Sequence, residues 1–187
     1  MGAERTAPGT GRVLGIDPGT VATGWGVVDE AEHRLLCVGS GVVRPNGSRA
    51  ERLASIFRAL CELVERYRPS VVSLEQSFVG DNVQTAFRLG EARGAVMVAA
   101  ASLGLPVVEY SPAQIKLAVV GSGRAVKAQM QVMVGKLLAT EALLAADEAD
   151  ALGAAICHVY AGAFNALVAQ ATPWGSRGGS GRRTWRR

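Results

Sequence analysis

Four acidic residues stand where apolar segments of this chain begin or end, and they constrain its fold more than any other feature. They are Asp17, Glu75, Asp147 and Asp150. The first two close short, apolar, strand-like runs, and the last two open an apolar helix-like segment. A carboxylate at the end of a buried strand is costly unless its charge is compensated. Several such groups brought together would suit a hard divalent cation, because Mg²⁺ prefers oxygen ligands.

The hydrophobic pattern predicts three strands, then a helix, a strand, a helix, a strand and further helices. The first three strands are expected at 12–17, 21–29 and 35–43, and their short links favour an antiparallel meander. Ser48 and Glu51 have the spacing of a capping box, which predicts a helix from Ser48 to Pro69. The later elements are expected as a strand at 70–75, a helix at about 82–102, a strand at 106–110, a short helix from Ser111-Pro112, a helix at 125–139 and a last helix at about 147–169.

This order of elements predicts the fold class. A meander followed by β-α-β units gives an α/β fold with a mixed five-stranded sheet and helices on both faces. That is a ribonuclease H-like arrangement, and the acidic residues would lie on its first strand, its fourth strand and its last helix. With 187 residues, 49% of them hydrophobic, the chain is long enough for one such domain, and we expect a single ribonuclease H-like domain at 12–170.

The two ends of the chain differ from this domain. Residues 1–11 are predicted to be a flexible leader, and 171–187 a basic disordered tail. The segment 173–187 carries five arginines and no acid, so its charge is +5. Since the whole chain has a net charge of +4, the remaining residues together carry −1. Such a tail either attracts nucleic-acid phosphates or simply keeps the end soluble.

Composition also indicates the cellular compartment. No run of about 18 apolar residues is free of polar breaks, so no membrane span is predicted. Cys37, Cys61 and Cys157 are far apart and form no C-x-x-C pattern. Reduced thiols in a cytoplasmic protein are therefore expected.

Each acidic residue alone has an ordinary alternative. Asp147 and Asp150 share a helix face and could merely cap the helix. Asp17 lies in a D-x-G-T pattern that is similar to the first phosphate loop of actin-like kinases, although that fold needs two such domains and this chain is too short for both. Together, however, the four carboxylates could hold two Mg²⁺ or Mn²⁺ ions about 3.5–4 Å apart, one activating water and one stabilising a departing 3′ oxygen.

Several long motifs in order make the chain recognisable. It resembles the RuvC family of bacterial Holliday junction resolvases from Val13 to Ala169. The resemblance is carried by LGIDPGTVATGWGVV (14–28), LEQSFVGDNVQTAFRLGEARG (74–94), VVEYSPAQIKLAVVGSGRAVKAQMQVMV (107–134) and ADEADALGAAICH (146–158). It implies a ribonuclease H-like fold, a homodimer, and Mg²⁺-dependent cleavage of four-way DNA junctions by two symmetric nicks during recombination and repair. It also assigns the catalytic and metal-binding roles to Asp17, Glu75, Asp147 and Asp150.

The resemblance implies DNA contacts as well. Lys116 and Lys127 match positions near the scissile phosphate, and the turn ending in Arg124 could approach phosphates. Phe78 matches an aromatic residue that stacks on an unpaired base. The ordinary alternatives are a solvated helix face for the lysines and packing beneath a loop for Phe78. Arg88 and Arg93, on the expected helix 82–102, could either pair with acids or reach DNA.

The helix at 82–102 is the candidate dimer interface, because it is rich in small residues and a two-fold dimer matches a two-fold junction. Its alternative is packing on its own sheet. A branch-migration motor, RuvA and RuvB, is the implied partner.

Two other functions compete with junction resolution: a YqgF-like nuclease acting on ribosomal RNA precursors, and a junction-binding module without activity. The EQSF segment and the basic region 116–127 favour the resolvase, and the complete set of carboxylates argues against an inert module.

Overall fold

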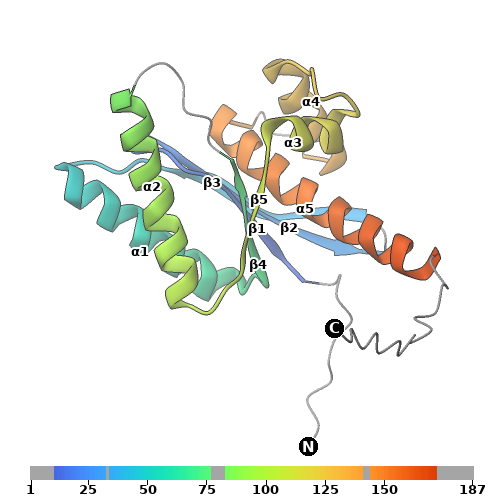
Figure 1. The fold of residues 1–187 in the computed structure, drawn as a ribbon, viewed down its shortest axis with the longest axis horizontal. Helices are drawn as coiled ribbons and strands as arrows, with labels where there is room; N and C mark the ends of the chain where they lie inside the picture. Colours follow the sequence, from blue (N-terminus) through green and yellow to red (C-terminus); the bar gives the residue numbers. More distant parts are fainter. Residues whose placement is uncertain (1–10, 33, 77–82, 141–143, 172–187) are drawn as a thin grey trace, which may run out of the picture.

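A single five-stranded sheet lies between two layers of helices in the computed structural model (Figure 1). The structure describes residues 11–32, 34–76, 83–140 and 144–171. The elements are β1 (Val13–Asp17), β2 (Thr23–Ala31), β3 (Arg34–Val43), α1 (Arg49–Tyr67), β4 (Val71–Glu75), α2 (Val83–Ser102), β5 (Val107–Tyr110), α3 (Pro112–Val120), α4 (Lys127–Leu137) and α5 (Ala146–Ala171). The predicted leader and tail lie almost entirely outside the described residues.

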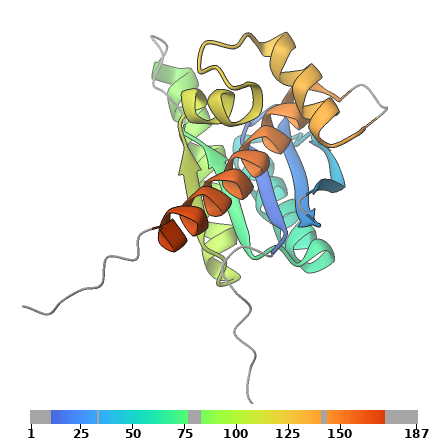
Figure 2. The ribbon, with the colours of Figure 1, turned by 90° about the vertical axis from the view of Figure 1, so that its right-hand side faces the viewer.

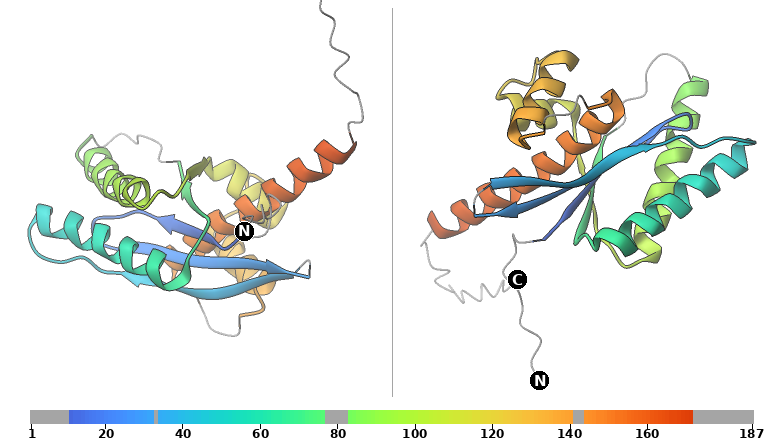
Figure 3. Two further views of the ribbon diagram at one scale, coloured as in Figure 1. Left: turned by 90° about the horizontal axis from the view of Figure 1, so that it is seen from below. Right: turned by 180° about the vertical axis from the view of Figure 1, so that it is seen from behind.

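The strand order is β3-β2-β1-β4-β5. Strands β1, β2 and β3 form the predicted antiparallel meander, while β4 pairs in parallel with both β1 and β5. Helices α1 and α2 cover one face, and α5 with α3 and α4 covers the other (Figure 3). The predicted mixed sheet with helices on both faces is confirmed. Among the helix starts, the largest difference between prediction and structure is at α4, which was expected to begin at residue 125. It begins two residues later, at Lys127, because Val126 still has an extended backbone.

Alternation along the strands divides the core into two clusters. Leu14 and Ile16 of β1 pack with α1 and α2, whereas Val13 packs with α3, α4 and α5. Strand β4 follows the same rule, with Val72 and Leu74 on the α1 side and Val71 on the α5 side. Because side chains alternate between faces, the odd-numbered positions of β1 and β4 all point toward α5.

Helix α5 crosses the sheet diagonally and very closely (Figure 2). Three glycines face it: a Cβ on Gly15 would lie 1.9 Å from the Ala151 carbonyl oxygen, one on Gly24 would lie 1.9 Å from the Asp147 carbonyl oxygen, and one on Gly26 would meet the Leu152 side chain at 2.4 Å. Only residues without a Cβ permit this approach. The small residues of β1 and β2 therefore set the height of α5 above the sheet.

A buried hydrogen bond secures the same helix from β4. The hydroxyl of Ser73, which is fully buried, donates to the Ala154 carbonyl oxygen over 2.8 Å. A helix interior carbonyl can accept this second hydrogen bond because it has two lone pairs. Ser73 thus joins β4 to the middle of α5, beside the glycines of β1 and β2.

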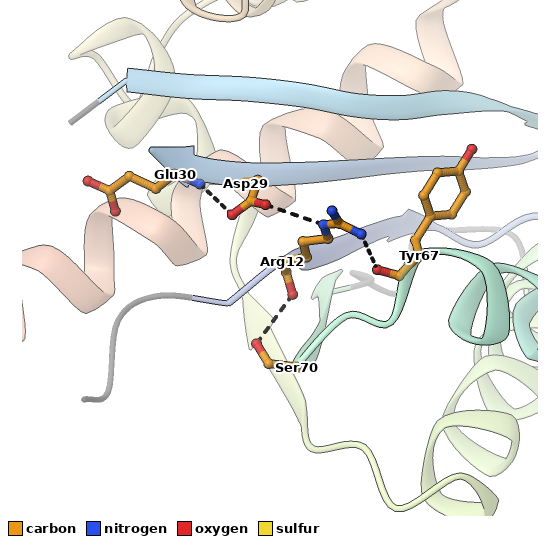
Figure 4. A network of polar contacts seen from close by, with 5 residues as sticks. All are labelled: Arg12, Asp29, Glu30, Tyr67 and Ser70. Carbon is orange, nitrogen blue, oxygen red and sulfur yellow. Dashed lines mark hydrogen bonds and ion pairs between the residues drawn. The ribbon is translucent and has the colours of Figure 1, made fainter. Parts of the chain in front are cut away.

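The opposite end of β1 is fixed by Arg12 (Figure 4). Its guanidinium contacts the Asp29 carboxylate at 3.3 Å and donates to the Tyr67 carbonyl oxygen at 2.9 Å, at the end of α1. Its own carbonyl accepts from the Ser70 amide at 2.8 Å. One residue therefore ties β1 to β2, to α1 and to the chain that enters β4.

The start of α1 has the predicted capping box, with the Ser48 side chain accepting from the Glu51 amide and the Glu51 carboxylate accepting from the Ser48 amide. Helix α3 begins as predicted, with Ser111 as N-cap and Pro112 in its first turn. None of the helices that the structure describes combines the length and the apolar character needed to span a membrane.

Substitution of Gly15 tests the close approach of α5. A Gly15→Ala methyl group would overlap a backbone oxygen that cannot move without moving the helix. We expect a loss of about 1–3 kcal/mol in the free energy of unfolding, measured by urea titration. Gly162→Ala on α5 is the matched control, because its Cβ would meet nothing within 4 Å. That control is expected to be neutral or stabilising by up to about 1 kcal/mol; equal effects of both changes would contradict the packing argument.

Candidate active site

Strand alternation brings Asp17 and Glu75 to one place. Both end their strands on the face covered by α5, and the two strands are parallel neighbours, with Ile16 opposite Leu74. On the other side, Asp17 is the register partner of Gly24, and Gly24 touches the backbone of Asp147. The contact between Gly24 and Asp147 therefore places the first turn of α5 beside the carboxyl end of β1.

The charges of the other three carboxylates all act on Asp17. The pKa of Asp17 is raised to about 7, first by burial and then by the negative charges of Asp150, Glu75 and Asp147, in that order of effect, while Lys127 opposes the shift. Burial is also the main reason that the pKa of Glu75 is raised, followed by the charge of Asp150. Four acids predicted from separate segments thus share one local field, as the sequence suggested.

Two lysines oppose this negative charge. The Lys127 ammonium lies 2.7 Å from an Asp150 carboxylate oxygen, and this contact raises the pKa of Lys127. Lys116 and Lys127 both act to lower the pKa of Glu75. Together with Glu75 and Asp150 they line an open cavity of about 210 Å³, whose other walls come from α3 and α4. A phosphate group entering this cavity would meet both lysines and two of the four acids, Glu75 and Asp150.

The site suits a hard cation by its chemistry. Its ligands are carboxylate oxygens, which Mg²⁺ and Mn²⁺ prefer. The repulsion that raises the pKa of Asp17 is the kind that a bound divalent ion relieves. In the part of the chain that the structure describes, no three acidic, histidine or cysteine side chains already stand in the arrangement that holds a metal ion. At Asp150, a cation would compete with the Lys127 ammonium for the same carboxylate.

The loop that follows Asp17 is firmly held. The buried Thr23 hydroxyl donates to the Gly19 carbonyl oxygen at 2.7 Å and accepts from the Gly19 amide at 3.2 Å. A Cβ on Gly19 would lie 2.2 Å from the Ala22 carbonyl oxygen, so glycine is required in this tight turn. The D-x-G-T pattern thus builds a rigid loop beside the site.

The structure separates the two arginines that the sequence left undecided. Arg93 is directed inward: it donates to the Glu75 carbonyl oxygen at 2.8 Å and pairs with Glu109 on β5. Its side chain is 15% exposed, so it anchors the end of β4 and positions Glu75. Arg88 is exposed and lies on the side of α2 that faces the start of α1.

The other predicted DNA contacts have different outcomes. Arg124 is exposed in the turn between α3 and α4 and does not line the cavity of Glu75 and Asp150. Phe78 lies outside the described residues. Sequence reasoning left Arg93 undecided between an acid and DNA, and it missed Ser73 and the role of Gly24 in placing Asp147. The glycines at 24 and 26 alternate on the strand face that points toward α5, and that spacing was the available signal.

Comparison with known proteins identifies the family. The model of the crossover junction endodeoxyribonuclease RuvC matches residues 13–158. The chain belongs to the RuvC family. RuvC of Citrifermentans bemidjiense is 46% identical over 157 residues, covering 83% of this chain and 96% of that protein. RuvC of Burkholderia ambifaria is 50% identical over 152 residues, covering 81% of this chain and 83% of its own length.

Solved RuvC structures agree with this assignment. Thermus thermophilus RuvC in complex with a Holliday junction substrate superposes with a TM-score of 0.76 at 35% identity, covering 82% of this chain and 96% of that one. The yeast mitochondrial Holliday junction resolvase Ydc2 gives a TM-score of 0.63 at 16% identity, which supports the fold alone. The ribonuclease H-like fold predicted from the order of elements is confirmed.

The raised pKa of Asp17 predicts a pH-dependent stability without metal. The folded protein keeps the Asp17 proton up to about pH 7, whereas an unfolded chain releases it near pH 3.9. Between these values the folded state binds more protons, so the free energy of unfolding falls as pH rises. Asp17→Asn removes this loss and is expected to stabilise the metal-free protein by roughly 2–4 kcal/mol above pH 7, with little effect near pH 4.

Urea unfolding in EDTA at pH 4.5 and pH 8 measures this difference. Glu62→Gln, an exposed change on α1, is the control and should leave the pH dependence as it is. Added Mg²⁺ at pH 8 is expected to raise the unfolding midpoint of the wild type more than that of Asp17→Asn. The same pH dependence in wild type and Asp17→Asn would show that Asp17 is not buried among like charges.

Proposed function

We propose that this protein resolves four-way (Holliday) DNA junctions by hydrolysing two phosphodiester bonds symmetrically. The observation that carries the proposal is the family match over 13–158, combined with a shared field of four carboxylates at the carboxyl ends of β1 and β4. The relatives are named crossover junction endodeoxyribonucleases, and one solved relative is described in complex with a Holliday junction substrate. Recombination and DNA repair are the processes that generate such junctions.

In this proposal Asp17, Glu75, Asp147 and Asp150 are the catalytic residues and the metal ligands. Two divalent cations, Mg²⁺ or Mn²⁺, would supply the Lewis acidity and activate the attacking water when bound. Lys116 and Lys127 face the same cavity, so they can orient the scissile phosphate and offset its charge. Arg93 keeps Glu75 in place through the backbone, and Phe78 and Arg124 are proposed to contact DNA near the crossover.

We also propose that the active form is a homodimer that pairs through α2. The side of α2 opposite its buried residues carries an uncharged stripe, formed by Val83, Phe87, Gly90, Gly94, Met97, Val98 and Ala101. Phe87 and Val98 are 63% and 61% exposed, and the space above Gly90 and Gly94 is open. Small residues four apart let two helices approach closely, so this stripe supports the predicted interface.

Two nicks must be coordinated on one junction. A two-fold dimer presents two identical sites at a fixed separation, which matches the approximate two-fold symmetry of the substrate. The family resemblance further suggests that the branch-migration motor RuvA and RuvB delivers the junction, and that the protein acts in the cytoplasm.

A synthetic four-way junction with labelled strands tests the activity. With Mg²⁺ or Mn²⁺ the wild type is expected to make paired nicks at symmetric positions that a ligase can reseal. Asp17→Asn is expected to bind the junction and lose at least about a thousandfold in cleavage rate, because a metal ligand is gone. Cleavage of a structured ribosomal RNA precursor without junction cleavage would favour the YqgF-like alternative, and tight binding without any nicks would indicate an inert junction-binding module.

Added bulk on the α2 stripe tests the dimer. Gly94→Leu fits an isolated subunit but would hold two α2 helices apart. Sedimentation velocity is expected to show a monomer, and junction nicks should lose their pairing. Ala54→Leu, which adds a leucine to an exposed position of α1, is the matched control and should remain dimeric. A dimeric Gly94→Leu would place the interface elsewhere.

A further inference from the structure

A second open cavity, of about 400 Å³, lies at the same edge of the sheet as the candidate active site. Strands β1, β3 and β4 run in one direction, because β2 is antiparallel to both β1 and β3. The loop after β1, the start of α1 and the start of α2 therefore emerge together at this edge. Thr20 and Val21 line the cavity, three and four residues after Asp17. The loop that follows Asp17 therefore forms part of the cavity wall.

The cavity carries a net positive charge. Arg49, Arg52 and Arg88 contribute three cations, and Glu91 contributes one anion. Arg49 pairs with Glu91 across the gap between α1 and α2. For Arg88, no hydrogen bond or ion pair is found within the described part of the chain. We call this group of residues the arginine cavity.

Arg52 gives the cavity a fixed wall. Its guanidinium donates to the Gly47 carbonyl oxygen at 3.0 Å and to the Thr20 carbonyl oxygen at 3.4 Å. It therefore binds the start of α1 to the loop that follows Asp17. Because a guanidinium has five N–H donors, these two contacts leave others available. The loop that follows Asp17 is consequently tied to the start of α1 at this cavity.

The lining also contains exposed apolar groups. Phe87 and Val21 are 63% and 72% exposed at this cavity. Because the dimer that we propose would cover Phe87, the arginines decide the choice of ligand, and they suit the phosphates of a nucleic-acid strand. The alternative occupant is the partner subunit, since Phe87 also belongs to the α2 stripe.

We propose that the arginine cavity binds backbone phosphates of the junction DNA next to the cut, with Arg88 and Arg49 as the phosphate ligands. This inference rests on the proposed function, since it assigns more of the same substrate to the protein. Thr20 and Val21 follow Asp17 closely in the chain and line this cavity, so a strand whose scissile phosphate lies at Asp17 would extend toward these arginines. Contacts on both sides of the scissile bond would hold the strand across the metal ligands.

The test measures binding of a fluorescent four-way junction by anisotropy, in the Asp17→Asn protein so that no cleavage occurs. Each of Arg88→Gln and Arg49→Gln is expected to weaken binding about tenfold at 0.1 M salt and to lower the salt-dependence slope by about 0.9, the value for one phosphate contact. Arg88→Lys should keep most of the slope. Arg58→Gln is the matched control, because Arg58 is exposed on α1 outside the cavity and, among the described residues, donates only to the Ala54 carbonyl oxygen.

The outcomes separate the possibilities. Loss of affinity and slope no greater than with Arg58→Gln would overturn this inference while leaving the proposed function intact. Arg88→Gln that sediments as a monomer would assign the cavity to the subunit interface and would also overturn it. Failure of the Asp17→Asn parent to bind a four-way junction at all would refute the proposed function, and the inference with it.

Discussion

The close contact between α5 and the sheet is the constraint on which the site depends. Gly15, Gly24 and Gly26 let the helix backbone lie against β1 and β2, and Ser73 fastens it to β4. A helix held farther away by ordinary side chains would carry its two acidic residues away from Asp17. The positions of the carboxylates therefore depend on the absence of Cβ atoms at these three glycines of β1 and β2.

The same packing buries Asp17 close to three other negative charges, which is electrostatically unfavourable. Burial and three neighbouring negative charges raise the pKa of Asp17 to about 7, and two lysines compensate only part of that charge. A site of this kind stores repulsion that a cation can release on binding. In the function that we propose, a metal ion bound by these carboxylates would relieve this repulsion and stabilise the fold.

Helix α2 connects three parts of the function that we propose. Its inner side holds Arg93, which fixes Glu75 through the end of β4. Its outer side bears the uncharged stripe around Gly90 and Gly94. Its third side contributes Arg88 to the arginine cavity. In the function that we propose, a single helix thus takes part in subunit pairing, in DNA contact and in the position of a catalytic carboxylate.

The sequence by itself determined the elements and the candidate acids. Alternating strands, a capping box at Ser48 and the proline after α1 are local signals, because each depends only on residues near one another in the chain. The family motifs added the roles of the four carboxylates. Arg93 and Arg88 lie only five residues apart on one helix, and no local pattern says which one turns inward. Only the tertiary structure decided that, because the partners of Arg93 come from β4 and β5, and the cavity of Arg88 is assembled from three separate segments.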